Sequence, residues 1–142
     1  MHLREKQQRL IAKYLVIEDA HERLAAITAN GRKWPAPTAD ERTETNRVQG
    51  CTSPVWLVGR MENGRCRFRA AAESALVQGL VALLCELYDG ELPREIAAVE
   101  PDLLTALGLD RQLSPTRLNG LAHVRRAIRA FAMGEVTREV EE

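Results

Sequence analysis

Hydrophobic residues recur at helical spacing over the first thirty positions, which predicts two helices there. The second helix is expected to begin after Asp19, because Asp19 and Glu22 three residues later resemble a capping box. Asn30 and Gly31 predict its end, since glycine tolerates the left-handed backbone conformation that a helix end often needs. The inward side chains expected for the first helix are Leu10, Ile11, Tyr14 and Leu15.

The pattern then changes from helical spacing to strict alternation. Residues 32–47 hold two prolines and few apolar side chains, which predicts an irregular polar crossing. Segments 54–61 and 65–70 flank Asn63-Gly64, the strongest short signal for a β-hairpin. One face of the second strand is apolar and the other is a row of guanidinium groups. The apolar members are Cys66, Phe68 and Ala70, and the basic members are Arg65, Arg67 and Arg69.

The rest of the chain is predicted to be helical. A largely apolar helix over Glu73–Asp89 should be buried, and short helices should follow over 93–99 and 101–107, each with proline near its start. A final amphipathic helix opens at Ser114-Pro115, and its polar end over 135–142 is expected to fray. We therefore predict a small α+β fold, a single domain over 1–142 with helices packed on a short antiparallel sheet. The inward side chains expected for the last helix are Leu118, Leu121, Val124, Ile128 and Phe131.

Charge and targeting signals exclude several classes of function. The 142 residues carry 20 basic and 20 acidic side chains, so bulk electrostatic binding to nucleic acid or to an anionic membrane is not expected. The N-terminus is too polar for a signal peptide, and the apolar stretch 75–88 is too short to span a bilayer. Three cysteines without paired spacing do not form a disulfide framework, which favours a cytoplasmic protein with reduced thiols.

Cys51 is the first candidate for chemistry. It lies where the polar crossing meets the hairpin, a surface position that core cysteines seldom occupy. Gly50 permits a tight backbone turn, and the hydroxyls of Thr52 and Ser53 could stabilise a thiolate. A small residue that only fills a turn is an equally good interpretation. Cys66 and Cys85 are instead expected to be buried as small apolar side chains.

Other site types have weaker support. The cysteines are 15 and 19 residues apart, no C-x-x-C pair is present, and none of the histidines is close in sequence to a cysteine, so no local signature predicts a metal site. Five arginines in 111–130 form either a solvated helix face or a surface for an acidic partner. Glu73 could serve the dipole of the long helix, and Arg117 a nearby anion or partner. The histidines are His2, His21 and His123, and the arginines are Arg111, Arg117, Arg125, Arg126 and Arg129.

The segment 48–56, Val-Gln-Gly-Cys-Thr-Ser-Pro-Val-Trp, resembles the SufE family of sulfur-acceptor proteins, including its CsdE branch. The family carries a G-C-x-S-x-V-W segment followed by a hairpin. The resemblance continues through 73–80, 113–121 and 126–130, with matching order and spacing. It covers a core of about 5–132 and leaves a polar tail over 133–142.

The resemblance implies a specific activity. A cysteine desulfurase, which uses pyridoxal phosphate, would hold sulfur as a persulfide, and Cys51 would accept that sulfur, stimulate the desulfurase and pass the sulfur on to an iron–sulfur assembly scaffold. Arg117 would support the desulfurase contact or the cysteine loop, Glu73 would have a docking or structural role, and Gly50 and Ser53 would support the loop. The chain would need no cofactor of its own. It would act as a persulfide carrier rather than as a self-sufficient enzyme.

Two positions depart from the family pattern, and two other functions compete. Pro54 replaces a residue with an amide hydrogen, and Ala71 replaces a polar residue ahead of Glu73. An IscU-type iron–sulfur scaffold would have a related fold. Such a site has an acidic residue near one cysteine and a histidine next to another, but Cys51 here has no such acid and Cys85 no such histidine. A bare interaction module, in which Cys51 is incidental, is the other alternative. At rest, we expect Cys51 to tuck against apolar neighbours, Val55 and Trp56, and to swing out on docking.

Overall fold

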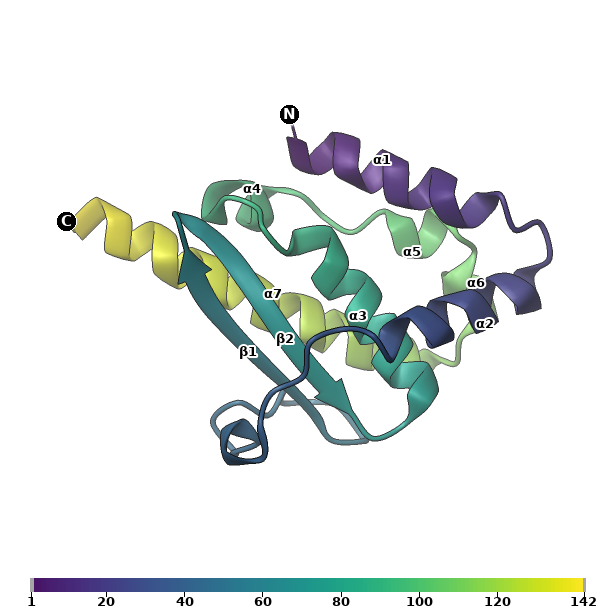
Figure 1. Ribbon diagram of the computed structural model, residues 1–142, viewed down its shortest axis with the longest axis horizontal. Coiled ribbons are helices and arrows are strands. Elements are labelled where there is room, and N and C mark those ends of the chain that lie inside the picture. The colour runs from purple at the N-terminus through teal and green to yellow at the C-terminus, as the bar shows by residue number, and fades with distance from the viewer. Residues whose placement is uncertain (1, 142) are drawn as a thin grey trace.

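The computed structural model describes residues 2–141 (Figure 1). Its sheet is the predicted hairpin, in which β1 (Val55–Glu62) pairs antiparallel with β2 (Arg65–Ala72). Asn63 and Gly64 both have positive φ, 53° and 78°, as a two-residue hairpin turn of this sequence requires. On β2 the alternation is as predicted, because Cys66, Phe68 and Ala70 are buried while Arg65 and Arg67 are exposed.

Two helices cover the apolar face of the hairpin. The first, α3 (Ala75–Tyr88), packs on β2, and the long α7 (Pro115–Glu141) crosses behind β1 (Figure 1). The ring of Phe68 on β2 meets the ring of Phe131 on α7 edge to face at 5.7 Å between centroids. The core therefore lies between the hairpin and these helices. The predicted α+β fold with helices packed on an antiparallel sheet is confirmed.

The N-terminal helices are α1 (His2–Leu15) and α2 (Ala20–Gly31). Asp19 caps α2 as predicted, since its carboxylate accepts hydrogen bonds from the N–H groups of His21 and Glu22. The predicted reason for Gly31 is wrong, because its φ is not positive and the helix ends in a right-handed residue. A Cβ on Gly31 would instead overlap the backbone of Gly79 in α3, so glycine lets α2 and α3 approach closely.

Short helices connect α3 to α7. They are α4 (Pro93–Ala98), α5 (Leu103–Ala106) and α6 (Leu109–Gln112), and α6 was not predicted. A 3-10 turn, η1 (Ala39–Glu41), lies in the polar crossing. The expectation that the chain frays from Glu135 is wrong, because α7 continues to Glu141. No helix within residues 2–141 is both long and apolar enough to cross a membrane.

The sequence offered a solvated helix face as one location for Arg125, but the structure buries this residue. It is 6% exposed, its guanidinium lies 4.6 Å from the ring centre of Tyr88, and Nη2 donates to the carbonyls of Ile96 and Val99 at 2.9 and 3.0 Å. Arg129 also donates from Nε to the carbonyl of Ala97 at 3.1 Å. These two arginines therefore fasten α7 to α4 and the residues after it.

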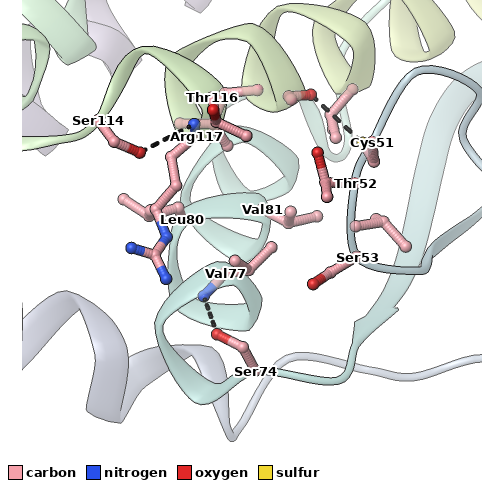
Figure 2. Close-up of a pocket in the computed structure, with 14 residues that line it drawn as sticks. Cys51, Thr52, Ser53, Ser74, Val77, Leu80, Val81, Ser114, Thr116 and Arg117 are labelled. Carbon is pink, nitrogen blue, oxygen red and sulfur yellow. Dashed lines mark hydrogen bonds between the residues drawn. The ribbon is translucent and has the colours of Figure 1, made fainter.

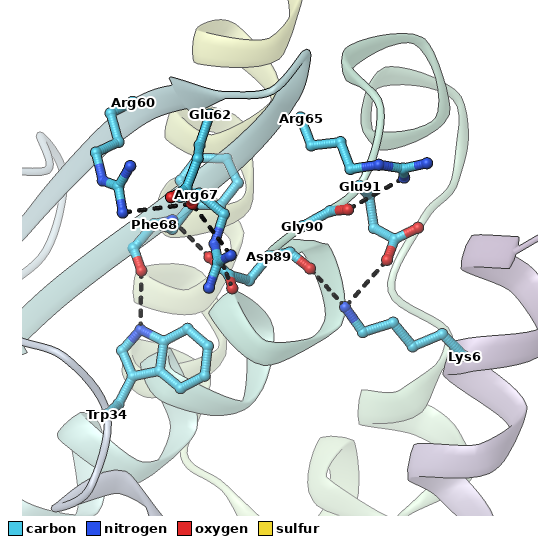
Figure 3. A network of polar contacts seen from close by, with 10 residues as sticks. All are labelled: Lys6, Trp34, Arg60, Glu62, Arg65, Arg67, Phe68, Asp89, Gly90 and Glu91. Carbon is cyan, nitrogen blue, oxygen red and sulfur yellow. Dashed lines mark hydrogen bonds and ion pairs between the residues drawn. The ribbon is translucent and has the colours of Figure 1, made fainter.

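A polar network holds the C-terminal end of α3 (Figure 3). The Asp89 carboxylate accepts the N–H of Phe68 at 2.8 Å and pairs with Nε of Arg67 at 3.0 Å. Lys6 on α1 donates to the Asp89 carbonyl at 2.7 Å and pairs with Glu91 at 3.2 Å. One cluster of side chains thus joins α1, α3 and the hairpin.

Candidate functional site

A pocket of about 330 Å³ lies at the opposite end of α3, where the N-termini of α3 and α7 face the loop that holds Cys51 (Figure 2). Ser74 caps α3 by accepting the N–H of Val77, and Ser114 accepts the N–H of Arg117 at the start of α7. The floor of the pocket is apolar and its rim carries hydroxyls and one arginine. The floor consists of Val55, Val77, Leu80, Val81, Leu121 and Val124, and the rim of Ser53, Ser74, Ser114, Thr116 and Arg117.

Cys51 lies on a loop over residues 49–54, the Cys51 loop. Both ends of this loop are fixed, because Val48 N–H donates to the carbonyl of Val55 at 2.8 Å. The Cys51 thiol is half-buried and donates a hydrogen bond to the carbonyl of Gly120 on α7, with 3.5 Å between sulfur and oxygen. Burial raises the pKa of the Cys51 thiol, and the positive charge of Arg47 partly opposes this effect. In this conformation the sulfur is therefore held as a protonated thiol.

The hydroxyls of Thr52 and Ser53 do not act as the sequence suggested. Both residues line the pocket, but in the part of the chain that the structure describes neither hydroxyl forms a hydrogen bond with the sulfur. The hydrogen-bond partner of Cys51 is a carbonyl, which stabilises the thiol and not the thiolate. The expected thiolate stabilisation by these hydroxyls is thus wrong for this conformation.

Gly50 is required for two reasons. Its φ is +91°, a conformation that L side chains rarely adopt, and a Cβ there would lie 2.5 Å from ring atoms of His123 on α7. Sequence reasoning missed His123, because the histidine is distant from Cys51 along the chain. The helical spacing contained a signal, since His123 lies three residues after Gly120 and shares its face of the helix.

Of the two predicted apolar neighbours of Cys51, the structure places only one at the pocket. Val55 lines it. Trp56 is not among the lining residues within 2–141, and its ring lies 5.6 Å from the guanidinium of Arg42. Because residues alternate between faces along a strand, consecutive residues could not both face the sulfur. Gly120 takes the place that was predicted for Trp56.

Of the two charged residues that were expected at the site, Arg117 lines the pocket and Glu73 does not. Arg117 lines the pocket across from Cys51 and is exposed, and within residues 2–141 its side chain has no ion-pair partner (Figure 2). Glu73 is exposed and directly precedes the cap residue Ser74, but it does not line the pocket. The structure thus brings Cys51, Ser53 and Arg117 to one cavity, with Gly50 in the backbone of the loop and Glu73 beside the rim.

The other two cysteines are buried, as predicted. Cys66 and Cys85 are 0% exposed, and burial raises the pKa of the Cys66 thiol to about 12. Burial also raises the pKa of the Cys85 thiol. Among residues 2–141 no three His, Cys, Asp or Glu side chains are grouped so that they could hold a metal ion. The iron–sulfur scaffold alternative would require the three cysteines to converge on one site. Within the described residues they do not.

Comparisons with known proteins agree on one family. The model of the SufE family, described as an Fe-S metabolism associated domain, matches residues 8–132. An uncharacterised SufE-like protein from Rhizobium etli is 33% identical over 128 residues, which cover 87% of this chain and 86% of that protein. Another from Synechocystis is 29% identical over 131 residues, which cover 89% and 82%.

Two further matches extend the comparison. The chloroplastic quinolinate synthase of Oryza sativa is 39% identical over 101 residues, which cover 70% of this chain but 14% of that protein. The solution structure of a hypothetical protein from Thermus thermophilus has a TM-score of 0.78 at 23% identity, over 93% of this chain and 96% of the other. This last likeness shows a shared fold.

Proposed function

This chain belongs to the SufE family, and from that premise we propose that it is a sulfur carrier whose Cys51 accepts persulfide sulfur from a cysteine desulfurase. The observation that carries the proposal is the position of Cys51. Of the three cysteine thiols, that of Cys51 is half-buried and the other two are buried. Cys51 lies on a loop at the edge of a pocket with an apolar floor. Such a thiol can be both reached by a partner and sheltered from solvent.

The transfer conserves atoms and electrons. The Cys51 thiolate attacks the outer sulfur of the donor's Cys–S–SH group, the S–S bond of the donor breaks, and the donor cysteine leaves as a thiolate. Cys51 then carries the S–SH group, and no oxidant or reductant is consumed. Because the thiolate is the nucleophile and burial raises the pKa of the Cys51 thiol, we propose that docking draws the loop out of the pocket before attack.

The other site residues support this step. Arg117 lies at the rim, and its guanidinium has no ion-pair partner within residues 2–141, which suits contact with an acidic group of the desulfurase or with the loop. Gly50 gives the loop its turn, Ser53 contributes to the rim, and the exposed Glu73 is available for docking. When the loop returns, the apolar floor would shield the persulfide from reductants in solution.

The partners follow from this chemistry. The desulfurase supplies sulfur with its own pyridoxal phosphate, and this chain needs no cofactor for thiol exchange. We propose that desulfurase activity increases when Cys51 removes the sulfur, and that the sulfur continues to an iron–sulfur assembly scaffold. Three free thiols suit a reducing compartment, and the proposal places the protein in the cytoplasm.

The decisive experiment is the intact mass of the protein after incubation with a desulfurase and cysteine. The wild type should gain ~32 Da, the mass of one sulfur atom, and a reductant should reverse the gain. Cys51→Ser should gain nothing, and Cys66→Ala, which removes a buried thiol, should behave as the wild type. A gain that persists in Cys51→Ser would refute the site assignment. No gain in any of these proteins would refute the carrier function and favour an interaction module.

A further inference from the structure

The imidazole of His123 covers the backbone of the Cys51 loop. A Cβ built on Gly50 would lie 2.5, 2.5 and 2.6 Å from Cδ2, Nε2 and Cε1 of the ring. Three nearly equal distances mean that the loop meets the face of the ring and not its edge. Only a residue without a side chain can lie this close, so Gly50 and His123 form a matched contact.

Arg126 holds the ring of His123 in place. Its Nη1 lies 3.1 Å from Nδ1 of His123. A guanidinium group can only donate hydrogen bonds, so this contact is a hydrogen bond when Nδ1 is the acceptor. The imidazole is then neutral and carries its proton on Nε2. Arg126 thereby fixes the orientation in which the ring covers Gly50.

The Cys51 loop rests on α7 at two points. The thiol donates to the carbonyl of Gly120, and Gly50 lies under the ring of His123, one turn further along the helix. A thiol is a weak donor and the S···O distance is 3.5 Å, so this bond alone holds the loop weakly. The ring over Gly50 is the second contact that holds it. A change at His123 should therefore reach Cys51 through the position of the loop.

We propose that His123 is a positioning residue: its imidazole, oriented by Arg126, holds the Cys51 loop against α7 and so limits access to the thiol. The biological meaning of this restraint rests on the proposed carrier function, in which the same thiol must be both sheltered and released. The restraint itself is a property of the free protein. It can be measured without any desulfurase.

The contact with Arg126 can be tested separately from the ring itself. Arg126 can only donate, so it orients the ring through Nδ1. Removing the guanidinium frees the ring to turn away from Gly50, whereas removing the ring abolishes the contact. Access to Cys51 should thus increase in both cases, and more when the ring is lost.

The test is the labelling rate of Cys51 by 4,4′-dithiodipyridine in the free protein, divided by the rate of 2-mercaptoethanol at the same pH. Cys66 and Cys85 are fully buried, and Cys51→Ser supplies the blank. At pH 8, His123→Ala should raise this ratio by a factor of roughly 3 to 10, the effect of losing one net contact from a closed–open equilibrium. His123→Phe retains a flat ring without a proton site, so it should label close to the wild type at pH 8. His21→Ala, on the exposed end of α2, is the matched histidine control.

A variant of Arg126 separates positioning of the ring from its simple presence. Arg126→Leu keeps the imidazole but removes its hydrogen-bond donor, so at pH 8 its ratio should lie between those of the wild type and His123→Ala. An unchanged ratio in His123→Ala, or a ratio in Arg126→Leu equal to that of the wild type, would overturn the proposal. If His123→Ala unfolds, as judged by thermal melting, the comparison of Arg126→Leu with the wild type decides alone. Failure of sulfur uptake with a normal labelling profile would instead refute the carrier function and leave the role of His123 intact.

Discussion

The two ends of α3 are built in opposite ways. At its C-terminal end, Asp89 joins the hairpin to α3 through short, charge-assisted hydrogen bonds, and Lys6 brings α1 into the same network (Figure 3). At its N-terminal end, the pocket has an apolar floor and a rim of hydroxyls (Figure 2). Gln78 ties α3 itself to β2 and α2 there, but the Cys51 loop rests on α7 through one long S–H···O bond and one ring contact. The first end is tied by charged contacts across three elements, and within residues 2–141 the loop at the second end has none of these.

This difference separates stability from reactivity. Substitutions in the network should lower the free energy of unfolding and leave Cys51 unchanged. Substitutions in the Cys51 loop should change the exposure of the thiol with a small effect on stability. The proposed carrier function would need this arrangement, because a loop that moves must not unfold the domain that holds it.

The largest expected effect comes from disrupting the close contact between α2 and α3. A Cβ on Gly79 would lie 2.7 Å from the Cα of Thr28, and the clash is with backbone that cannot rotate away. Gly79→Ala should therefore destabilise the protein by ~3 kcal/mol through overpacking between α2 and α3, measured by urea unfolding. Gly134→Ala is the control, since a Cβ there meets nothing and should stabilise α7 by ~0.5–1 kcal/mol. Equal effects of the two substitutions would contradict the close approach of α2 and α3.

The next effect distinguishes the two ends directly. Asp89→Ala leaves the N–H of Phe68 without its acceptor and removes one ion-pair partner of Arg67, which still pairs with Glu62, so it should cost ~2 kcal/mol. Asp89→Asn keeps an acceptor oxygen and should cost less. Ser53→Ala at the pocket rim should change stability by less than ~0.5 kcal/mol. A loss for Ser53→Ala as large as that for Asp89→Ala would refute the contrast between the ends.

Local patterns predicted the local parts of this fold. The hairpin followed from Asn63-Gly64 and the alternation on β2, and the cap of α2 followed from Asp19, because each feature depends on residues that are close in sequence. Cys51 could be singled out for the same reason, since a cysteine after a glycine at a loop junction is unusual. Its role came from the family resemblance and not from spacing.

The features that sequence reasoning missed depend on contacts between distant elements. Gly31 does end α2, as predicted, but the reason is its close approach to Gly79 in another helix and not a left-handed backbone. Arg125 was placed on a face that is either solvated or open to an acidic partner, but Tyr88 and the carbonyls of Ile96 and Val99 surround it. His123 was considered distant from any cysteine. A periodic pattern shows which residues share a face but not which element covers that face.

A smaller effect tests whether the loop opens independently of stability. Gly50→Ala and Gly64→Ala both force alanine into a positive φ, which costs ~1–2 kcal/mol in each case. A Cβ on Gly64 has open space, whereas one on Gly50 would also displace the ring of His123. Both variants should thus lose similar stability, but only Gly50→Ala should label faster at Cys51. Faster labelling in both would mean that Cys51 responds to overall stability and not to the loop contact.

The smallest effect concerns the segment that leads into the Cys51 loop. Glu41 in η1 pairs with Arg69 on β2 at 2.5 and 2.6 Å, and the hydrogen bonds from Arg69 lower the pKa of the Glu41 carboxyl from 4.5 to about 2. A lowered pKa in the folded state means that the pair stabilises the protein above about pH 4.5 and that this contribution is lost as the pH falls towards 2. Glu41→Gln should therefore be slightly less stable than the wild type at pH 6, and the two should converge near pH 2 in urea unfolding. Glu44→Gln removes an ion pair whose carboxylate is 83% exposed, and it should show a smaller difference at pH 6. A difference between Glu41→Gln and the wild type that is the same at pH 6 and pH 2 would show that the Glu41 charge does not tie this segment to the hairpin.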